Sequence, residues 1–294
     1  MAIYLNRDTR IMIQGITGSV GSTQAKLTKD YGSAIVGGVA PGKGGREVHG
    51  LPVFDSVAEA VEVTQANASV IFVPASAAPE AAHSALDAGL GLVVIITEHV
   101  PVRESLDIQL HARECGAVVI GPNCPGLLTP GVGRMGIIPG HVATPGKVGV
   151  VSRSGTLAFE VAADLTDAGI GQSTIVGIGG DVAPCTSLLE VLSQFEEDPS
   201  TEAVVIVGEV GGSSEEQAAE YIKKAMKKPV FAFVAGRCAP PGKKMGHAGA
   251  IVRGKAGTAA HKVRALEDAG VAIARNPIQL PGLINARLGR RNSR

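Results

Sequence analysis

The chain has 294 residues, which is long for one domain and comfortable for two. Lys and Arg number 27 and so do Asp and Glu, so the formal net charge is zero and gives no reason to expect nucleic acid or an anionic membrane as a partner. The longest apolar run, Leu90 to Ile96, is too short to span a bilayer, and the N-terminus lacks an apolar signal core, so we expect a cytoplasmic location.

The N-terminal half alternates strand and helix patterns. Strands are expected at Arg10–Gln14, Ile35–Val39, Ser69–Val73, Leu92–Ile96 and Val118–Ile120. Helices are expected at Ser22–Tyr31, Pro79–Ala88 and Arg103–Cys115. This alternation predicts an α/β fold with an open, Rossmann-like parallel sheet that binds ligands at the carboxyl ends of its strands.

A glycine-rich turn, Gly15-Ile16-Thr17-Gly18-Ser19-Val20-Gly21, follows the first strand. Its backbone amides and the next helix N-terminus would suit a phosphate, although a plain tight turn explains the pattern equally well. A Rossmann dehydrogenase needs an acid after the second strand to hold a ribose. Here the sequence has Val39-Ala40-Pro41-Gly42-Lys43-Gly44-Gly45, and a lysine in a glycine loop favours a phosphorylated, nucleotide-like ligand other than NAD.

The prolines at 130, 139 and 145 punctuate a stretch without a clear helix. We therefore expect a domain over 1–125, a linker over 126–146 and a second domain over 147–294. The second half repeats the alternation, which predicts a flavodoxin-like, doubly wound sheet whose edge Val271–Ile273 closes. Its other expected strands are Lys147–Ser152, Ser173–Ile178, Ala203–Val207 and Val230–Val234, and its helices are Thr156–Ala168, Thr186–Glu197, Ser214–Met226 and Thr258–Ala269.

The second half carries three candidate site elements. Ser154 and Gly155 stand where a strand ends and a helix begins, so they form a candidate anion site, with Ser154 also a candidate N-cap. Glu209 ends a strand among glycines and could hydrogen-bond one nitrogen of a histidine. His247 lies between glycines near Lys243, Lys244 and Arg253, which favour an anion over a metal, and its imidazole could carry a phosphoryl group.

Cysteine chemistry is not expected to contribute. Cys115, Cys124, Cys185 and Cys238 lack CxxC spacing, which argues against a disulfide framework and against a zinc site. Cys124 has no base beside it in sequence, so we expect a packed small residue rather than a nucleophile. Its neighbour Asn123 could instead orient the imidazole.

The stretch Met-Gly-His-Ala-Gly-Ala-Ile at 245–251 resembles the phosphohistidine loop of the succinyl-CoA synthetase (succinate–CoA ligase) α-subunit family. Gly-Pro-Asn-Cys-Pro-Gly at 121–126 is similar to a second signature of that family, and the Lys43 loop is similar to its coenzyme A loop. The resemblance covers nearly the whole chain. It implies that Ser154 and Gly155 bind the phosphoryl group and that Glu209 orients His247. It also implies coenzyme A contacts at Thr17, Gly18, Ser19, Val20, Lys43, Ile96, Thr97 and Glu98, among which Val20 departs from the expected polar residue.

The resemblance implies an acid–thiol ligase that works reversibly through phosphohistidine on a small dicarboxylate, with succinate the expected acid. The chain lacks the motif G-x-x-x-x-G-K-[S/T]. An ATP-grasp type β subunit should therefore supply the site for ATP or GTP and Mg²⁺, in an αβ or α2β2 assembly, and no metal site is expected in this chain.

Two departures from the family bear on the acid. Phe159 stands where the family usually has a tyrosine associated with the carboxylate substrate, and the segment Gly180-Asp181-Val182-Ala183-Pro184-Cys185 has a displaced proline and a cysteine in place of glycine. Malate or another small dicarboxylate therefore remains an alternative substrate. Two alternatives of other classes are a non-catalytic, coenzyme A-binding regulatory protein and an NAD-dependent redox enzyme.

Overall fold

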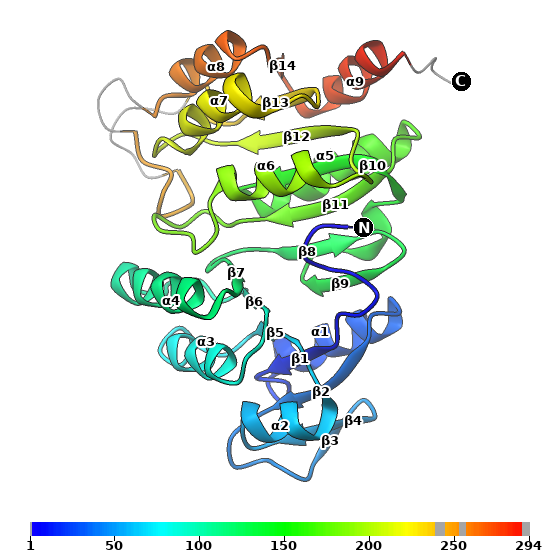
Figure 1. The fold of residues 1–294 in the computed structure, drawn as a ribbon, viewed down its shortest axis with the longest axis vertical. Helices are drawn as coiled ribbons and strands as arrows, with labels where there is room; N and C mark the ends of the chain where they lie inside the picture. The colour runs from blue at the N-terminus through cyan, green and yellow to red at the C-terminus, as the bar shows by residue number, and fades with distance from the viewer. Residues whose placement is uncertain (1, 239–244, 253–256, 290–294) are drawn as a thin grey trace.

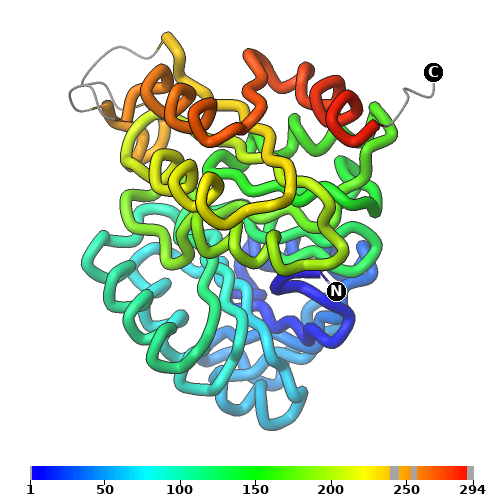
Figure 2. The backbone as a smooth tube through the Cα atoms, turned by 45° about the horizontal axis from the view of Figure 1, so that its top comes forward, coloured from blue at the N-terminus to red at the C-terminus, as the bar shows by residue number. Residues whose placement is uncertain are grey.

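The computed structural model describes residues 2–238, 245–252 and 257–289. Two seven-stranded sheets lie one above the other along the long axis of the molecule, the N-terminal half below and the C-terminal half above (Figures 1 and 2). In the order of the chain, the N-terminal half contains β1 Ile11–Gln14, α1 Ser19–Asp30, β2 Ile35–Val39, β3 Glu47–Val48, β4 Leu51–Phe54, α2 Val57–Thr64, β5 Ala68–Ile71, α3 Ala78–Asp87, β6 Leu92–Ile95, α4 Val102–Cys115 and β7 Val118–Ile120. The rest contains β8 Gly126–Thr129, β9 Gly133–Gly136, β10 Pro145–Ser152, α5 Gly155–Asp167, β11 Gln172–Gly177, α6 Leu188–Glu197, β12 Ala203–Gly208, α7 Ser214–Ala225, β13 Val230–Val234, α8 Ala259–Asp268, β14 Ala272–Ala274 and α9 Leu280–Leu288, with short 3-10 turns at Gly140–Val142 and Pro277–Gln279.

The first sheet has the order β3-β4-β2-β1-β5-β6-β7, and every pair except β3–β4 is parallel. The strand order reverses between β1 and β5, as expected for a Rossmann-like sheet. Such a reversal opens a crevice at the carboxyl ends of the strands. The glycine-rich turn after β1 lies at this point, which confirms the expected fold class for this half.

The second sheet has the order β14-β13-β12-β10-β11-β8-β9. Its first five strands are parallel in the flavodoxin-like arrangement, with a reversal between β10 and β12. As expected, the last short strand, β14, lies at one edge.

The segment 126–146, which we expected to be a linker, instead extends this second sheet. β8 pairs antiparallel with β11, and β9 pairs antiparallel with β8. The strands have only four residues each and begin or end with glycines, so their sequence reads as a loop. A Cβ on Gly126 would lie 2.1 Å from the Met135 carbonyl oxygen, so glycine allows the two strands to approach closely.

Most expected helices and strands are present with ends shifted by one to three residues. The largest shift is at the start of α1, which begins at Ser19 rather than Ser22, and α6 begins at Leu188 rather than Thr186. A Cβ on Gly21 would lie 2.2 Å from the Gly15 carbonyl oxygen in the turn after β1, so glycine allows the helix to begin inside the glycine-rich turn. Ser187 and Glu190 form a capping box that fixes the start of α6.

The core lies between the sheets and their helices. β1, β5, β6, β11 and β12 are buried along their whole length. The sequences of β6 and β12 are almost entirely aliphatic, as expected for strands covered on both faces, whereas β11 begins with three buried polar residues. The two halves share one of the buried clusters, because Leu127 and Met135 of the β8–β9 hairpin pack with Ile11 and Ile13 of β1. The two halves are therefore packed against each other through a shared hydrophobic core.

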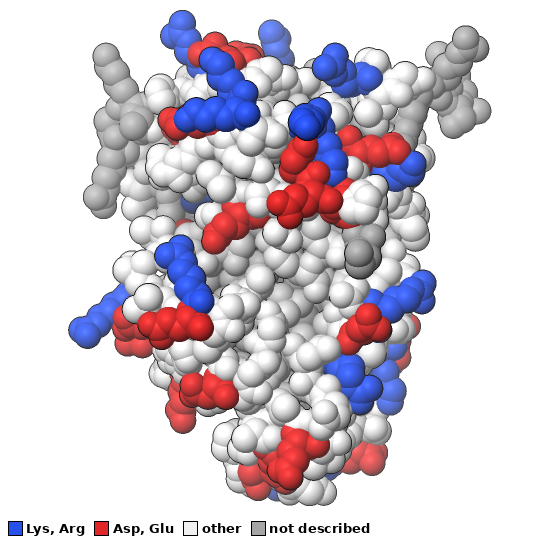
Figure 3. Space-filling view, in the orientation of Figure 1, with Lys and Arg blue, Asp and Glu red and all other residues white. Residues whose placement is uncertain are grey.

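Acidic and basic side chains are interspersed on the face drawn in Figure 3, around a largely uncharged centre. Within the residues that the structure describes, none of the helices has the length and apolar character needed to cross a membrane.

Candidate active site

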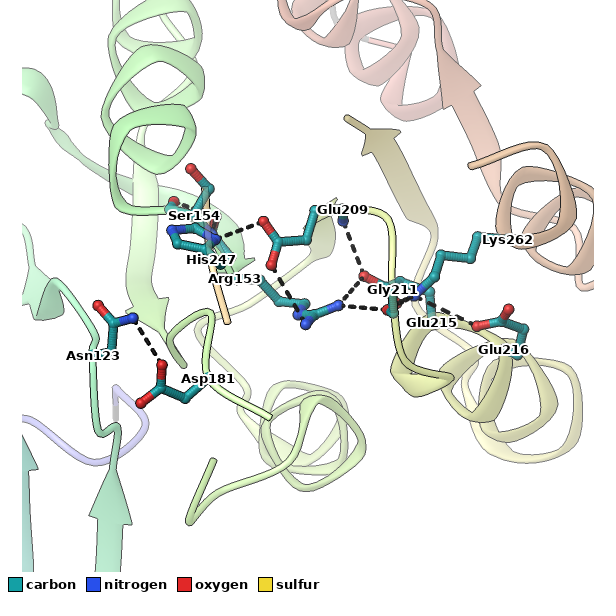
Figure 4. A network of polar contacts seen from close by, with 11 residues as sticks. Asn123, Arg153, Ser154, Asp181, Glu209, Gly211, Glu215, Glu216, His247 and Lys262 are labelled. Carbon is teal, nitrogen blue, oxygen red and sulfur yellow. Dashed lines mark hydrogen bonds and ion pairs between the residues drawn. The ribbon is translucent and has the colours of Figure 1, made fainter. Parts of the chain in front are cut away.

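His247 lies beside the carboxyl ends of β10 and β12, where the order of the second sheet reverses. Its Nδ1 is 2.7 Å from Oε2 of Glu209, which directly follows β12 (Figure 4). The Glu209 side chain is buried, whereas that of His247 is 30% exposed. The hydrogen bond to Glu209 raises the pKa of His247 above its ordinary value, and desolvation opposes this rise. A neutral ring that donates Nδ1–H to the carboxylate leaves the lone pair on Nε2 available.

Glycines allow the imidazole to lie directly against the backbone. A Cβ on Gly180 would lie 2.2 Å from Cγ of His247, so any larger residue there would displace the ring. Gly246 has a φ of +82°, in the region that favours glycine, and Gly249 donates its N–H to the Gly180 carbonyl (3.0 Å). The cations expected near the ring, Lys243, Lys244 and Arg253, lie outside the described residues.

The N-terminus of α5 lies on the other side of His247. Ser154 is its N-cap, and its hydroxyl accepts a hydrogen bond from the Leu157 N–H (3.4 Å). Gly155 follows as the first residue of the helix, and there is no acidic residue in the first turn. Ser154, Gly155 and His247 line the same cavity, so the positive end of the helix dipole is placed to stabilise an anion at the imidazole.

This cavity, of about 680 Å³, also reaches the N-terminal domain. Four of the residues expected to contact coenzyme A line it, namely Val20, Ile96, Thr97 and Glu98. Thr17, Gly18 and Ser19 lie next to them, from the turn after β1 into the start of α1, and Lys43 donates to the Thr17 hydroxyl (3.0 Å). Residues more than 200 positions apart in sequence therefore open onto one space.

Asn123 has a different partner from the one expected. It lines the cavity with His247, but its side-chain amide donates to the Asp181 carboxylate (2.9 Å). Asp181 stands next to Gly180, so Asn123 supports the backbone against which the ring lies. Cys124 is buried, and burial raises the pKa of its thiol to about 12, which agrees with a packed residue rather than a nucleophile.

The two departures that bear on the acid lie in different places. Phe159, one turn into α5, lines the cavity with His247. Cys185 is buried against α4, where its thiol lies 3.5 Å from the Ser105 carbonyl oxygen, so it faces the N-terminal domain rather than the imidazole. Val182 is 60% exposed and lines a second cavity beside Asp181. Phe159 alone among these three shares a cavity with the ring.

Within the described part of the chain, no group of three or more His, Cys, Asp or Glu side chains is placed to hold a metal ion. The site therefore combines a nucleophilic nitrogen, a carboxylate that fixes the ring, a helix N-terminus and a cavity that joins the two domains. These are the groups needed to accept a phosphoryl group and pass it to a substrate in the same cavity.

Comparisons with known proteins agree with this arrangement. Residues 6–99 match the family model of the CoA binding domain, and residues 151–272 match that of CoA-ligase. The chain is 53% identical over 282 residues to the succinate–CoA ligase [ADP-forming] subunit alpha of Aquifex aeolicus, covering 95% of this chain and 92% of that one. The chain belongs to the succinate–CoA ligase α-subunit family. A relative from Archaeoglobus fulgidus, subunit alpha 1, is 54% identical over 274 residues, covering 93% and 94%.

A solved structure extends the likeness to a larger enzyme. The ATP citrate lyase of Methanothrix soehngenii, in complex with citrate and coenzyme A, matches with a TM-score of 0.87 and 28% identity over 97% of this chain. The match covers 51% of that protein, so this chain spans about half its length.

The sequence alone did not reveal a group of buried charged residues on the side of Glu209 away from His247. Arg153, Glu215 and Lys262 are all buried and extend the line of polar contacts away from His247 (Figure 4). The signal was present in the helices, because Glu215 precedes Ala218, Ala219 and Ile222 on one buried stripe, and Lys262 lies between Ala259 and Leu266 on another. A charged residue on such a stripe needs a buried partner.

Proposed function

We propose that this chain is the α subunit of an ADP-forming succinate–CoA ligase and that His247 carries the phosphoryl group. The observation that carries the proposal is the shared cavity, where the His247 imidazole and the N-terminus of α5 meet four expected coenzyme A residues. The names of the relatives from A. aeolicus and A. fulgidus support succinate as the acid and ATP as the nucleotide.

In the first step, Nε2 of His247 attacks the γ-phosphorus of ATP and ADP leaves. Glu209 Oε2 accepts the Nδ1–H hydrogen bond, which fixes the ring and stabilises the positive charge that develops on it. Backbone N–H groups at the start of α5, beside Ser154 and Gly155, stabilise the transferred phosphoryl group.

In the second step, a carboxylate oxygen of the acid attacks phosphorus, the N–P bond breaks and an acyl phosphate forms. In the third step, the thiolate of coenzyme A attacks the acyl carbonyl, and inorganic phosphate leaves. Each step is a displacement at a single centre, so the intermediates replace one difficult reaction with easier ones. Each step can also run in reverse.

The residues expected to contact coenzyme A fall into two groups, one suited to the phosphates of its nucleotide portion and one suited to its pantetheine arm. Lys43 and the N-terminus of α1 provide positive charge and free N–H groups for phosphates, since α1 has no side-chain N-cap and no acid in its first turn. Val20, Ile96 and Thr97 line the cavity towards His247, where the pantetheine arm would extend. The thiol can therefore reach the acyl phosphate while the nucleotide portion stays on the N-terminal domain.

An ATP-grasp β subunit, in an αβ or α2β2 assembly, would supply the site for ATP and Mg²⁺. The absence of a Walker lysine motif from the sequence and of a metal-binding group among the described residues supports this division of labour. When bound, Mg²⁺ would neutralise the charge of the triphosphate during transfer.

The test is to co-express the chain with its β subunit and to measure coenzyme A-dependent release of phosphate from ATP with succinate, malate and other small dicarboxylates. The proposal expects the highest kcat/KM with succinate and a phosphoenzyme that is lost in His247→Ala. Coenzyme A binding without phosphoenzyme formation would instead indicate a regulatory binding protein.

A further inference from the structure

Behind Glu209 lies a buried cluster of charges that the proposed chemistry does not use directly. Arg153 directly follows β10, Glu215 is in the first turn of α7, and Lys262 is in α8. The side chain of Arg153 is 7% exposed, and those of Glu215 and Lys262 are fully buried. Burying several charged groups is costly, so their placement behind one carboxylate calls for a reason.

The guanidinium of Arg153 lies between the two carboxylates. Its Nη2 is 3.4 Å from Glu209 Oε1, and its Nη1 is 3.6 Å from Glu215 Oε1. Nη1 also donates to the Gly211 carbonyl (3.0 Å) in the loop between β12 and α7. Arginine can hold such fixed, divergent contacts because its donors lie in one rigid plane.

Glu209 depends on this guanidinium. Among the described residues, Oε1 of Glu209 is buried without a hydrogen-bond donor, and the ion pairs of Glu209 are those with Arg153 and His247. The second carboxylate is close, since Glu215 Oε1 accepts the Glu209 N–H (3.1 Å). Without a cation between them, two neighbouring buried carboxylates would repel each other, so Arg153 holds the Glu209 side chain in place.

The remaining groups hold Arg153 and Glu215 in place. Lys262 Nζ donates to Glu215 and to the Gly211 carbonyl (2.8 Å), and it lies 3.6 Å from Glu216, which is paired in turn with His261. The phosphohistidine loop lies directly on the guanidinium, because a Cβ on Gly249 would be 2.9 Å from Arg153 Nη2. The charge of Asp181, whose carboxylate accepts a hydrogen bond from Asn123, also raises the pKa of His247.

We propose that Arg153 is a positioning residue for phosphoryl transfer, which holds the Glu209 carboxylate aimed at Nδ1 of His247 so that Nε2 stays the nucleophile. This inference rests on the proposed function of His247. Arg153 acts through Glu209 and the loop that bears the imidazole, and Lys262 with Glu215 anchors it from the far side.

The test uses Arg153→Gln and Arg153→Lys in the assembled αβ enzyme, with Lys147→Gln as the matched control. Lys147 is a cation in the same strand, β10, and it pairs with Glu202 at the exposed opposite end (2.5 Å). The rate of phosphohistidine formation is measured by rapid quench with labelled ATP across pH. For Arg153→Gln we expect a loss of about 10- to 100-fold, since misplacement by about 1 Å can cost about a hundredfold. The KM for coenzyme A should not change.

Arg153→Lys keeps the charge but loses the rigid fork, so it should fold as the wild type does and show a smaller loss of rate. It also keeps the test decisive if Arg153→Gln does not fold. The pH dependence of the rate provides a second measurement, which would not change if Arg153 had only a structural role. The charge of Arg153 lowers the pKa of His247, so the acidic limb should move to higher pH in Arg153→Gln and stay in place in Arg153→Lys.

A double variant separates action through Glu209 from general destabilisation. If Arg153 acts through Glu209, then Arg153→Gln combined with Glu209→Gln should be no slower than Glu209→Gln alone. Losses that multiply, or a wild-type rate in both Arg153 variants, would overturn the proposal. Absence of label from wild-type His247 would instead overturn the proposed function.

Discussion

Replacing Glu209 with glutamine tests the arrangement of the site most directly. Glutamine keeps the shape of the side chain and can still accept the Nδ1–H hydrogen bond through its carbonyl oxygen, but it removes the charge. In the wild type, the His247 imidazole donates a charge-assisted hydrogen bond of 2.7 Å to the buried Glu209 carboxylate. Such bonds contribute about 1.5–3 kcal/mol, so phosphohistidine formation should slow by about 10- to 150-fold at high pH.

Glu209→Gln should also shift the pH dependence of phosphohistidine formation in a defined direction. In the wild type, the Glu209 hydrogen bond raises the pKa of His247, so the neutral, nucleophilic ring gains population only as pH rises through that raised value. Glu209→Gln removes the largest cause of the rise. The acidic limb should therefore move to lower pH while the plateau falls, and the ratio of wild-type to variant rates should be smallest on the acid side.

The assay is rapid-quench labelling of the assembled enzyme across pH, with Glu202→Gln as the control. Glu202 immediately precedes β12 and Glu209 immediately follows it, so the two variants remove a carboxylate from opposite ends of one strand. The control should label as the wild type does. An acidic limb that stays in place in Glu209→Gln, or moves to higher pH, would refute the assigned role of the carboxylate.

Three further predictions concern other parts of the site. His247→Ala should abolish phosphoenzyme formation and leave coenzyme A binding nearly intact, and the wild-type label should be acid-labile and base-stable; an acid-stable label would point to serine. Lys43→Ala should weaken coenzyme A binding and reduce its salt dependence, measured by calorimetry at two ionic strengths, because it removes the cation that we propose to pair with a phosphate of coenzyme A. Phe159→Tyr should move the ratio of kcat/KM towards succinate and away from less polar acids such as itaconate, since the added hydroxyl can hydrogen-bond a carboxylate at about 0.5–1.5 kcal/mol; an unchanged ratio would separate Phe159 from recognition of the acid.

Most of the parallel strands were predictable because they contain short aliphatic runs bounded by glycine or polar residues, but β4, which pairs parallel with β2, was not among the expected strands. β2, β7 and β13 match their expected bounds, and both sheets have the expected fold class. The short antiparallel strands were not predictable in this way. β3 has two residues, and β8 and β9 have four each, so tertiary pairing rather than local pattern makes them strands.

The candidate site was predictable where local sequence carries the chemistry. Strand ends, glycines and a helix start mark Ser154, Glu209 and His247 individually, and the structure adds that they share one reversal point of the sheet. Arg153 directly precedes Ser154 in sequence, yet its role depends on Glu215 and Lys262, which come from two different helices. Long-range ion pairs of this kind have no local signature beyond a charge on a buried helical stripe.

The charge balance around Glu209 connects these residues to the state of the imidazole. Among the described residues, the cluster contains two cations, Arg153 and Lys262, and three carboxylates, Glu209, Glu215 and Glu216. When His247 is protonated, three positive charges balance the three carboxylates. This balance favours the imidazolium form, in agreement with the raised pKa of His247. A ring phosphorylated on Nε2 keeps its Nδ1–H, so the same bond to Glu209 can persist before and after transfer. The Glu209 carboxylate therefore does not have to move during the transfer. The charge that changes is that of the phosphoryl group on Nε2, which faces the N-terminus of α5.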